Sequence, residues 1–596
     1  MSADRVLIGA VSATFVDSRL AMPQLLGSGE PIDFLVFDCL AEGVMSILFR
    51  AKAAGQPGWV TDFVEGQVSP YLDQIARRGI KVVANAGGLD PEGCADALRR
   101  IAADQNIPIR IASISGDDLS HRIDELVQPG TPDMFEGASV RERLDRGDKP
   151  LCLTAYTGAF PIAAALDAGA DIVVAGRCVD SATTLGALIH RFGWDAGDFD
   201  RLAAGTLIGH LIECTTQATG GTFTDWQDVP DWANIGFPIA ACSADGTAEI
   251  YKPSGTGGLV SRATLSEQML YEVSDPARYI VPDVICDFSD VSFEETSSNR
   301  VAVSGARGRG RPETLKATLA WDQGWRASAL IPIVGLDAHA KAERLADAMF
   351  ERAGALALAQ GLSPYAKFHR DVIGDEGPGM GRVVCRLVAD HPDARGAALF
   401  AREQSSLITS TAPGVSVPLG TQVRPLTRIA SFALDRSEVS LAIEVDGEIV
   451  EWADSVGGSE IVTPPPAPPE PASTTQECTP KDLVDLAWVR SGDKGNLFNV
   501  AVIARRPELL PWLWNALTPE AVSGHYASTL GVDAQSINVE RYPVPGIDAM
   551  NLVVEHALDG GMLASAAFDP AAKGMGQLLL TFRIPVPDTA IEQKKD

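Results

Sequence analysis

Residues 170–192, ADIVVAGRCVDSATTLGALIHRF, decide the fold class of this chain. A short, continuous apolar run ends in a polar turn, and a segment with helical spacing follows it. Similar strand-like runs occur at 5–11 (RVLIGAV), 32–38 (IDFLVFD), 80–88 (IKVVANAGG) and 107–119 (IPIRIASISGDDL), with helix-like segments between them. Short apolar strands that alternate with helices are typical of a parallel sheet covered on both faces. The sequence therefore predicts a large N-terminal α/β domain.

Polar and glycine residues stand where these strands are expected to end. In open α/β sheets, ligands bind beyond the carboxyl ends of the strands. We therefore expect substrate-binding groups at one rim of the sheet, drawn from the following residues: Asp17, Ser18, Asp38, Asn85, Gly87, Gly88, Arg177, Asp180 and Ser181. Asp117 and Asp118 follow a further strand at this rim. Arg177 suits bidentate binding of a carboxylate, and an internal pair with Asp180 is the alternative. Asp180 or Ser181 alternatively caps the next helix.

The domain organisation changes twice along the chain. From about residue 240, strands with alternating polar and apolar residues and a long helix at 338–361 predict an α+β portion packed on the first, so that the core domain covers 1–462. Residues 463–480, TPPPAPPEPASTTQECTP, contain seven prolines and form an extended linker. Residues 481–590 then form a small α+β domain, with RSGDKGN (490–496) as a loop between two strands and QLLLTFRIPV (577–586) as a late strand.

Composition excludes several classes of partner. The formal charge is −29, from 49 basic and 78 acidic residues, which argues against a nucleic-acid or anionic-membrane surface. The nine cysteines are scattered singly, as is typical of reduced thiols. We see no secretory signal and no apolar run of membrane-spanning length. We expect a cytoplasmic homo-oligomer with a small-molecule substrate.

Residues 205–226, GTLIGHLIECTTQATGGTFTDW, gather titratable side chains around a Thr-Gly-Gly turn. His210 and Glu213 share one face of a helix and suit general acid/base catalysis, with a surface or subunit-interface pair as the alternative. Asp225 is a second catalytic carboxylate or a turn cap. We interpret Cys214 as a buried small side chain in preference to a nucleophile. Further substrate-binding candidates here are Gln217, Thr219, Gly220 and Gly221.

Two other glycine-rich stretches carry charges. KPSGTGGLV (252–260) is not a Walker A motif, but it suits the binding of a phosphate or carboxylate; a hairpin turn with a solvated lysine is the alternative. Its candidate binding residues are Lys252, Gly255, Thr256, Gly257 and Gly258. Residues 490–496 bring Arg490, Asp493 and Lys494 either over the main site or into a solvated turn.

No cofactor is predicted from the sequence. HExxH, HxH and clustered histidines are absent from the sequence, so a zinc site is not expected. An oxygen-ligated Mg²⁺ ion at Asp38, Asp180 or Asp225 stays compatible with the residues.

Long motifs make the chain similar to the acyclic terpene utilisation (AtuA-like) family. They include LAEGVMS (40–46), TDFVE (61–65), AGRCVDSATTLG (175–186), LAAGTLIGHLIECTTQATGGTFTDW (202–226), NIGFPIA (234–240), KPSGTGGLV, QMLYEVSDPARYIVPDV (268–284), VSGARG (303–308) and, after the linker, RSGDKGN. The resemblance implies a ferredoxin-like second domain. It also implies a role in the breakdown of acyclic terpenes or branched acids through coenzyme A thioesters.

The chain departs from the family pattern in two loops. GAVSATFVDS follows the first strand where the family has a glycine-richer loop, although Asp17 and Ser18 remain. SAAFDPAAKGMGQ, near the C-terminus, retains Asp569 and Lys573 but lacks the polar residues between them.

Two functions fit these residues. The first is a hydratase-type lyase acting on a branched or unsaturated acyl-CoA, with His210 and Glu213 as acid and base and the Gly220 and Gly221 amides as oxyanion donors. The second is a non-catalytic accessory subunit of a biotin-dependent acyl-CoA carboxylase. A biotin-carrier lysine motif is absent, so carriage of biotin itself is disfavoured.

Overall fold

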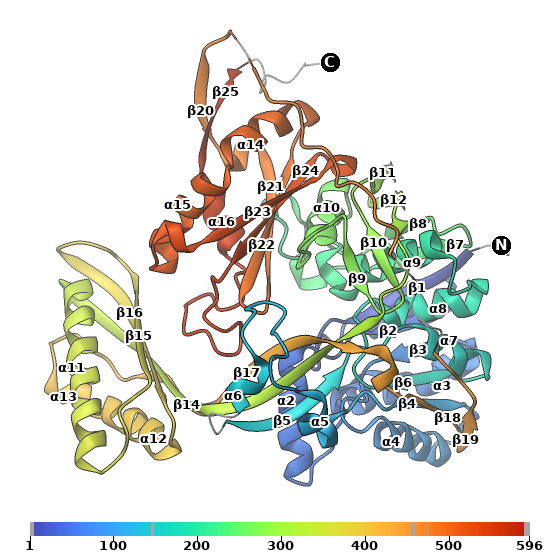
Figure 1. The fold of residues 1–596 in the computed structure, drawn as a ribbon, viewed down its shortest axis with the longest axis horizontal. Coiled ribbons are helices and arrows are strands. Elements are labelled where there is room, and N and C mark those ends of the chain that lie inside the picture. Colours follow the sequence, from blue (N-terminus) through green and yellow to red (C-terminus); the bar gives the residue numbers. More distant parts are fainter. Residues whose placement is uncertain (1–4, 145–147, 455–457, 459, 474, 589–596) are drawn as a thin grey trace.

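The computed structural model describes residues 5–144, 148–454, 458, 460–473 and 475–588. Figure 1 shows three parts: a body built on a large sheet, an arm at the left, and a C-terminal domain above the body. Long strands join the arm to the body, and the hairpin of the C-terminal domain reaches down to the seam where the parts meet.

Five parallel strands form the centre of the body. They lie side by side in the order β1 (Arg5–Ser12), β2 (Phe34–Phe37), β3 (Lys81–Ala84), β6 (Ile172–Ala175) and β4 (Ile111–Ser115). Each strand is short and largely buried, as the continuous apolar runs require. The predicted parallel sheet is confirmed, and its carboxyl ends share one edge.

Antiparallel strands extend this sheet on both sides. One side adds, in order, β7 (Ile239–Ser243), β8 (Ala248–Tyr251), β12 (Arg300–Ser304) and β11 (Ser292–Ser297), and the other adds β18 (Ala442–Val445) and β19 (Glu448–Val450). Part of the region beyond residue 240 therefore continues the first sheet instead of forming a separate layer. Hairpins of alternating strands can add to a sheet edge without a crossover helix.

Helices cover both faces of the sheet and create two hydrophobic cores. One face packs against α1 (Ala21–Gly27), α2 (Glu42–Ala53), α3 (Leu72–Arg78) and α4 (Pro91–Asp104), and the other against α7 (Phe160–Asp167), α8 (Ala182–Phe192) and α9 (Phe199–Glu213). Local signals fix the helix starts: at α4, the Asp90 side chain accepts a hydrogen bond from the Gly93 amide, and Pro91 occupies the first turn.

The arm is organised around one long strand. β14 (Thr314–Leu336) pairs with β5 (Lys149–Ala155) near the body and with β16 (Met380–His391) and β17 (Leu419–Asp435), while β15 (Lys367–Gly374) lies beside β16. The helices α11 (Ala338–Ala359) and α12 (Ala394–Glu403) cover one face of this sheet. The long helix predicted at 338–361 is confirmed.

The C-terminal domain has four antiparallel strands in the order β21 (Ala487–Lys494), β22 (Leu497–Ala504), β24 (Ala549–Glu555) and β23 (Asn538–Val544). Its helices are α14 (Leu510–Ala516), α15 (Pro519–Leu530) and α16 (Met575–Leu579), and β20 (Cys478–Asp482) pairs with β25 (Arg583–Pro587). Short elements elsewhere are α5 (Ile123–Leu126), α6 (Val140–Leu144), β9 (Tyr279–Val281), β10 (Val284–Asp287), α10 (Arg262–Leu270), β13 (Arg307–Gly308) and α13 (Leu407–Ser410).

Two local predictions in this domain are wrong. Most of 490–496 is not a loop, because β21 runs to Lys494 and pairs with β22 up to Leu497. Only Gly495 and Asn496 remain as the turn, and the positive φ of Gly495 (55°) suits such a two-residue hairpin. Residues 577–586 are also not one strand, since α16 occupies the first part and β25 begins at Arg583. Among the helices of the described ranges, none has the length and apolarity needed to cross a membrane.

Candidate functional site

The candidate site lies at the seam between the parallel sheet of the body and the hairpin of the C-terminal domain. The domain is docked by direct bonds: the Val489 amide donates to the Thr224 hydroxyl at 2.9 Å, and Asn499 Nδ2 donates to the Leu270 carbonyl at 2.7 Å. Helix α10 and the segment after α9 supply the body's side of this contact. The seam therefore places β21 opposite the carboxyl edge of the sheet.

The sheet edge contributes a first group of polar side chains. Asp38 follows β2, and its Oδ1 accepts a hydrogen bond from Asn85 Nδ2 at 2.5 Å. Asn85 follows β3 and is fixed by the Cys39 amide, which donates to its Oδ1 at 2.6 Å. Arg177 follows β6 and donates to Asp180 Oδ1 at 2.9 Å. The parallel strands thus bring together four predicted residues that are far apart in the sequence.

The surroundings of Asp38 favour its neutral form. Burial raises the pKa of Asp38 well above its usual range, and the charges of Asp180 and Glu213 raise it further. Arg177 and the hydrogen bond from Asn85 act in the opposite direction without cancelling the rise. In its protonated form, which this shift favours, the carboxyl at the end of β2 is a proton donor.

His210 and Glu213 pair at the end of α9. The Nδ1 atom of His210 lies 2.9 Å from Glu213 Oε1, and its Nε2 lies 3.0 Å from the Met269 carbonyl oxygen, so both ring nitrogens are engaged. Glu213 opposes the effect of burial and raises the pKa of His210, while burial raises the pKa of Glu213 against the influence of His210. Glu213 Oε2 is buried without a hydrogen-bond partner. The free atom of this pair is therefore the carboxyl oxygen and not the imidazole.

Three lysines add positive charge from three different parts of the chain. Lys316 of β14 lies 2.5 Å from Glu42 of α2. Lys494 of β21 lies 3.1 Å from Glu272, and Lys573 lies 2.7 Å from the other oxygen of Glu272. Burial opposes these charges, but Lys316 and Lys494 lower the pKa of Glu42 to about 2, and the pKa of Glu272 also falls well below its usual range. Both glutamates are therefore ionised at neutral pH.

We call this set the charge cluster: Asp38, Glu42, Tyr156, Arg177, Asp180, His210, Glu213, Glu272, Lys316, Asp493, Lys494 and Lys573. Lys494 connects its two sides, because Glu272, Asp180 and Glu42 all raise its pKa against the effect of burial. The side chains of this cluster are not fully enclosed: 32% of the Lys494 side chain, 29% of Asp180 and 22% of Glu42 stay exposed. Solvent thus reaches the cluster inside the seam.

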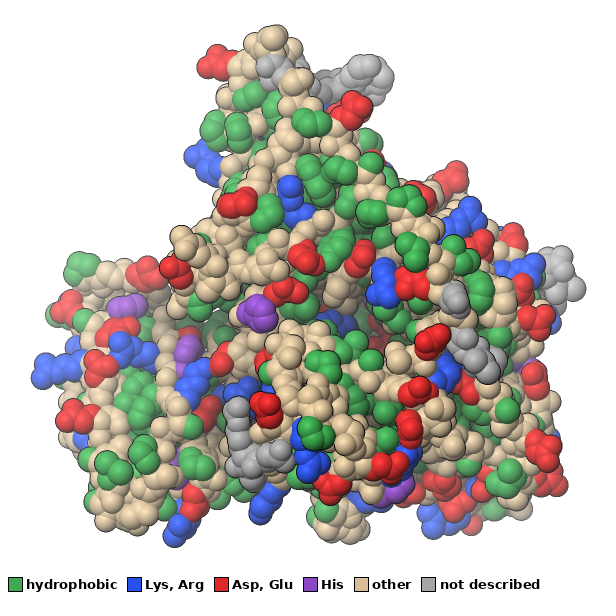
Figure 2. Space-filling model, in the orientation of Figure 1, with side chains coloured by type: hydrophobic (Ala, Val, Ile, Leu, Met, Phe, Trp, Pro, Cys, Tyr) green, Lys and Arg blue, Asp and Glu red, His purple; other side chains and the backbone are tan. Residues whose placement is uncertain are grey.

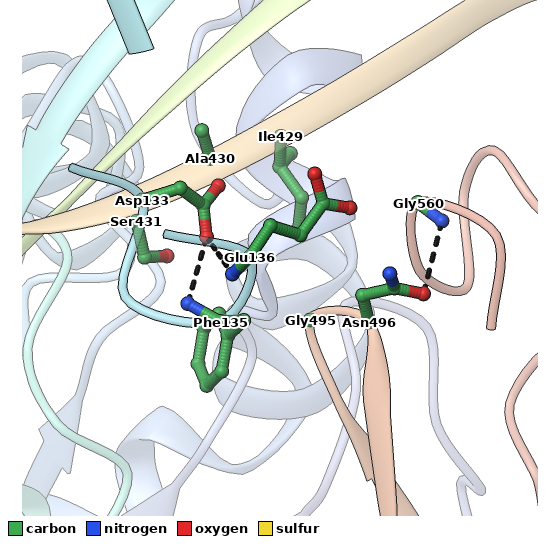
Figure 3. Close-up of a pocket in the computed structure, with 9 residues that line it drawn as sticks. All are labelled: Asp133, Phe135, Glu136, Ile429, Ala430, Ser431, Gly495, Asn496 and Gly560. Atoms are coloured by element: carbon green, nitrogen blue, oxygen red, sulfur yellow. Dashed lines mark hydrogen bonds between the residues drawn. The ribbon is translucent and has the colours of Figure 1, made fainter. Parts of the chain in front are cut away.

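A surface pocket opens beside the charge cluster. Figure 3 shows its lining, which comes from the loop at Asp133–Glu136, from β17, and from the C-terminal domain at Gly495, Asn496 and Gly560. Asp133 fixes the loop by accepting hydrogen bonds from the Phe135 and Glu136 amides. The Phe135 ring lies 5.4 Å from Lys316 Nζ and packs against Gly495, the residue after Lys494. Two lining residues of the pocket, Phe135 and Gly495, therefore lie beside lysines of the cluster.

The glycine-rich turns serve backbone packing. The amides of Gly220 and Gly221 donate to the Gln217 and Thr216 carbonyls, so they are not free to bind an oxyanion. A Cβ atom at Gly257 would lie 2.1 Å from the Asp231 carbonyl oxygen. The amides of Gly257, Gly258 and Gly87 likewise donate to backbone carbonyls, and Gly88 and Gly255 adopt positive φ.

Lys252 does not join the charge cluster. Its Nζ donates to the Thr256 carbonyl of its own turn at 2.8 Å, and burial alone lowers its pKa. The half-buried Asp17 and the exposed Ser18 also stand apart, since both accept hydrogen bonds from backbone amides of their own loop. These contacts match the plainer alternatives of turn and loop closure.

Two further predicted residues, Asp225 and Arg490, join the two domains. Asp225 binds Arg505 through both oxygens, at 2.6 and 2.7 Å, and accepts a hydrogen bond from Trp488. Arg490 donates to Gln217 Oε1 at 2.7 Å and also contacts Thr222. The Thr219 hydroxyl bonds to the Gly236 carbonyl within the body. Burial raises the pKa of Cys214 well above its usual range, which disfavours a nucleophilic thiolate.

Sequence reasoning missed several members of the charge cluster. Glu42 and Glu272 lie inside motifs that carry the family resemblance, and Lys573 lies in one of the loops that depart from it. Lys316 and Tyr156 had weaker signals: Lys316 is a single charge in a strand-like run, and Tyr156 follows another strand. Tyr156 stacks 4.1 Å from the Arg177 guanidinium and donates to Glu42. Within the described residues, no group of three or more His, Cys, Asp or Glu side chains is arranged to hold a metal ion.

Comparisons with known proteins assign the family. Residues 6–445 match the model described as acyclic terpene utilisation family protein AtuA, and residues 481–585 match the AtuA ferredoxin-like domain. The chain therefore belongs to the AtuA family, which connects it with acyclic terpene utilisation. No curated protein matches it. Among solved structures, the crystal structure of an aspartate kinase from Synechocystis is 9% identical, with 96% of this chain and 75% of that chain covered and a TM-score of 0.12, so this likeness supports no conclusion.

Figure 2 shows basic side chains scattered among acidic ones over the face in view. The lysines that matter for the candidate site are instead gathered at the seam by the fold.

Proposed function

We propose that this protein is a hydratase-type lyase that acts on a branched or unsaturated acyl-CoA thioester in the breakdown of acyclic terpenes or branched acids. One observation carries the proposal: the buried Oε2 of Glu213 has no hydrogen-bond partner and belongs to the same charge cluster as Asp38, whose pKa burial raises. Acids and bases with displaced pKa values, held together at a seam, are typical of catalytic sites.

The surroundings divide the roles of the two carboxyl groups. Burial raises the pKa of both carboxyl groups, but His210 acts against this rise at Glu213, whereas the charges of Asp180 and Glu213 add to it at Asp38. Glu213 therefore acts as the base and Asp38 as the acid. His210 acts through Glu213, because its own ring nitrogens are already bonded.

Hydration of the substrate then starts from the ionised form of Glu213 and the protonated form of Asp38. Glu213 takes a proton from water, and the water oxygen bonds to C3 of the enoyl thioester as the C2–C3 double bond breaks. The electron pair moves toward the thioester carbonyl, and Asp38 gives its proton to C2. The proton left on Glu213 returns to Asp38 through solvent, so the net change is the addition of one water molecule.

Positive side chains support the negative charge that develops on the thioester oxygen. Lys494 and Arg177 both exert their charge on the groups around Asp38 and Asp180. Fixed charges directed at a developing oxyanion are among the largest contributions to catalysis. This assignment replaces the Gly220 and Gly221 amides, which are engaged in their own turn.

Hydration of 3-methylbut-2-enoyl-CoA by purified variants tests the proposal. We expect Glu213→Gln to lower kcat/KM by a factor of about 10² or more, since a general base contributes about 10²–10⁴-fold. Glu267→Gln is a matched control: Glu267 is also a buried carboxyl, whose pKa burial raises to about 8, but it accepts a hydrogen bond from the Thr224 amide. It should keep its turnover.

Two results would contradict the hydratase proposal. A folded Glu213→Gln variant with unchanged turnover would refute the role of Glu213. A wild-type protein that neither binds nor hydrates the thioester, and that co-purifies with carboxylase subunits, would instead support the accessory role.

A further inference from the structure

Among the described residues, several buried polar atoms in and beside the charge cluster lack a hydrogen-bond partner. They include Nε of Arg177, Oγ of Ser181 and Oε2 of Glu213. The Arg177 and Ser181 side chains lie after β6, at the start of α8, and Glu213 ends α9. Buried polar groups are normally paired, so several such atoms in one place indicate that something else binds there.

Ser181 and Glu213 both belong to the contact between α8 and α9. A Cβ atom at Gly209 would lie 2.8 Å from the Ser181 Cβ, so Ser181 packs directly on α9. Gly209 is one helical turn before Glu213, and residues four apart lie on the same face of a helix. Asp180, next to Ser181, also raises the pKa of Glu213, which agrees with this proximity.

The Ser181 hydroxyl makes no hydrogen bond that would give it a structural role. It stands at the N-cap position of α8, where a serine usually bonds to a backbone amide, but its side chain makes no such bond. Its exposed fraction is 1%, so water from the surface does not satisfy it. A hydroxyl can donate one hydrogen bond and accept others, while an ionised carboxylate only accepts.

We propose that Ser181 and Glu213 together bind one oxygen atom of the ligand, the hydroxyl of a 3-hydroxyacyl thioester. The Ser181 hydroxyl donates to this oxygen, and the ligand hydroxyl donates to Glu213 Oε2. The substrate class is therefore a hydroxylated acyl group in preference to its deoxy analogue. This inference rests on the proposed function, because the same oxygen is the one that hydration adds.

Equilibrium binding tests the inferred contact with the ligand hydroxyl separately from the proposed hydratase activity. We would titrate the full-length protein with 3-hydroxy-3-methylbutanoyl-CoA and with 3-methylbutanoyl-CoA, which lacks the hydroxyl, and measure heat release. The wild-type protein should bind the hydroxylated probe at least about tenfold more tightly, and Ser181→Ala should remove most of this preference. Ser523→Ala is the matched control, because this buried hydroxyl bonds to the Glu520 carbonyl within α15. Its preference should equal that of the wild type.

Each result has one consequence. Equal binding of the two probes by the wild type, or an unchanged preference in Ser181→Ala, would overturn the inference even if the enzyme hydrates enoyl-CoA. A preference that depends on Ser181 without turnover would keep the inference and reject the hydratase assignment. Failure of both probes to bind would overturn both.

Discussion

Replacing Lys494 by methionine should weaken the seam between the domains. Lys494 lies 3.1 Å from Glu272, and its charge also acts on Asp180 and Glu42. Methionine keeps most of the apolar stem and removes only the ammonium group. Without it, Glu272 keeps Lys573 as its remaining lysine partner.

The expected loss of unfolding free energy follows from how exposed the Lys494 and Glu272 side chains are. Breaking a fully buried ion pair costs about 3–5 kcal/mol, whereas an exposed pair contributes about 0–1 kcal/mol. The Lys494 and Glu272 side chains are 32% and 25% exposed, which places the pair between these limits. We expect the free energy of unfolding to fall by about 1–3 kcal/mol.

Lys367→Met provides a matched control. Lys367 of β15 also forms a lysine–carboxylate pair with the C-terminal domain, at Asp559, but the two side chains are 38% and 55% exposed. Its loss should cost about 0.5 kcal/mol or less. Urea unfolding of both variants, followed by tryptophan fluorescence, measures the difference. Equal effects of the two substitutions would refute the reasoning that the charge cluster is a buried, tightly coupled set.

Three further predictions follow from particular contacts. Asp225→Asn weakens the pair of hydrogen bonds that joins residue 225 to Arg505, so it should lower the melting temperature but leave enoyl-CoA hydration intact. A loss of turnover in a well-folded variant would contradict this prediction. Gly257→Ala should be much more destabilising in urea than Gly255→Ala, because only the first introduces a clash with backbone, and equal costs would contradict the packing role. The pKa of Glu42 is lowered from 4.5 to about 2, so its stabilisation is present above pH 4.5 and lost as the pH falls toward 2. The stability difference between wild type and Glu42→Gln should shrink over that pH range, and a constant difference would count against the pairing.

The sequence predicts the sheet edge well because the evidence there is local. Short apolar runs identify the parallel strands, and the first polar residue after each run marks where the strand ends. Asp38, Asn85 and Arg177 are found together for this reason. His210 and Glu213 are likewise paired by helical spacing alone.

The glycine turns and the lysines could not be interpreted from local patterns. A glycine that admits a neighbouring backbone and one that admits a ligand look the same in a sequence, and Gly257 proves to be the first kind. Lys316 lies on a strand whose partners are distant in the sequence. Lys494 lies on a local hairpin, which reaches the seam only through bonds to distant residues of the body. Lys252, which stands beside a similar glycine turn, is bonded within that turn.

The central claim is that the seam between the body and the C-terminal domain is a binding site for the acyl group. A crystal structure of the full-length protein with 3-hydroxy-3-methylbutanoyl-CoA tests it most directly. The account predicts the acyl oxygen within hydrogen-bond distance of Glu213 Oε2, and the thioester carbonyl facing Lys494 or Arg177. An acyl group bound elsewhere, for example at the Lys252 turn, with the charge cluster unchanged, would contradict it.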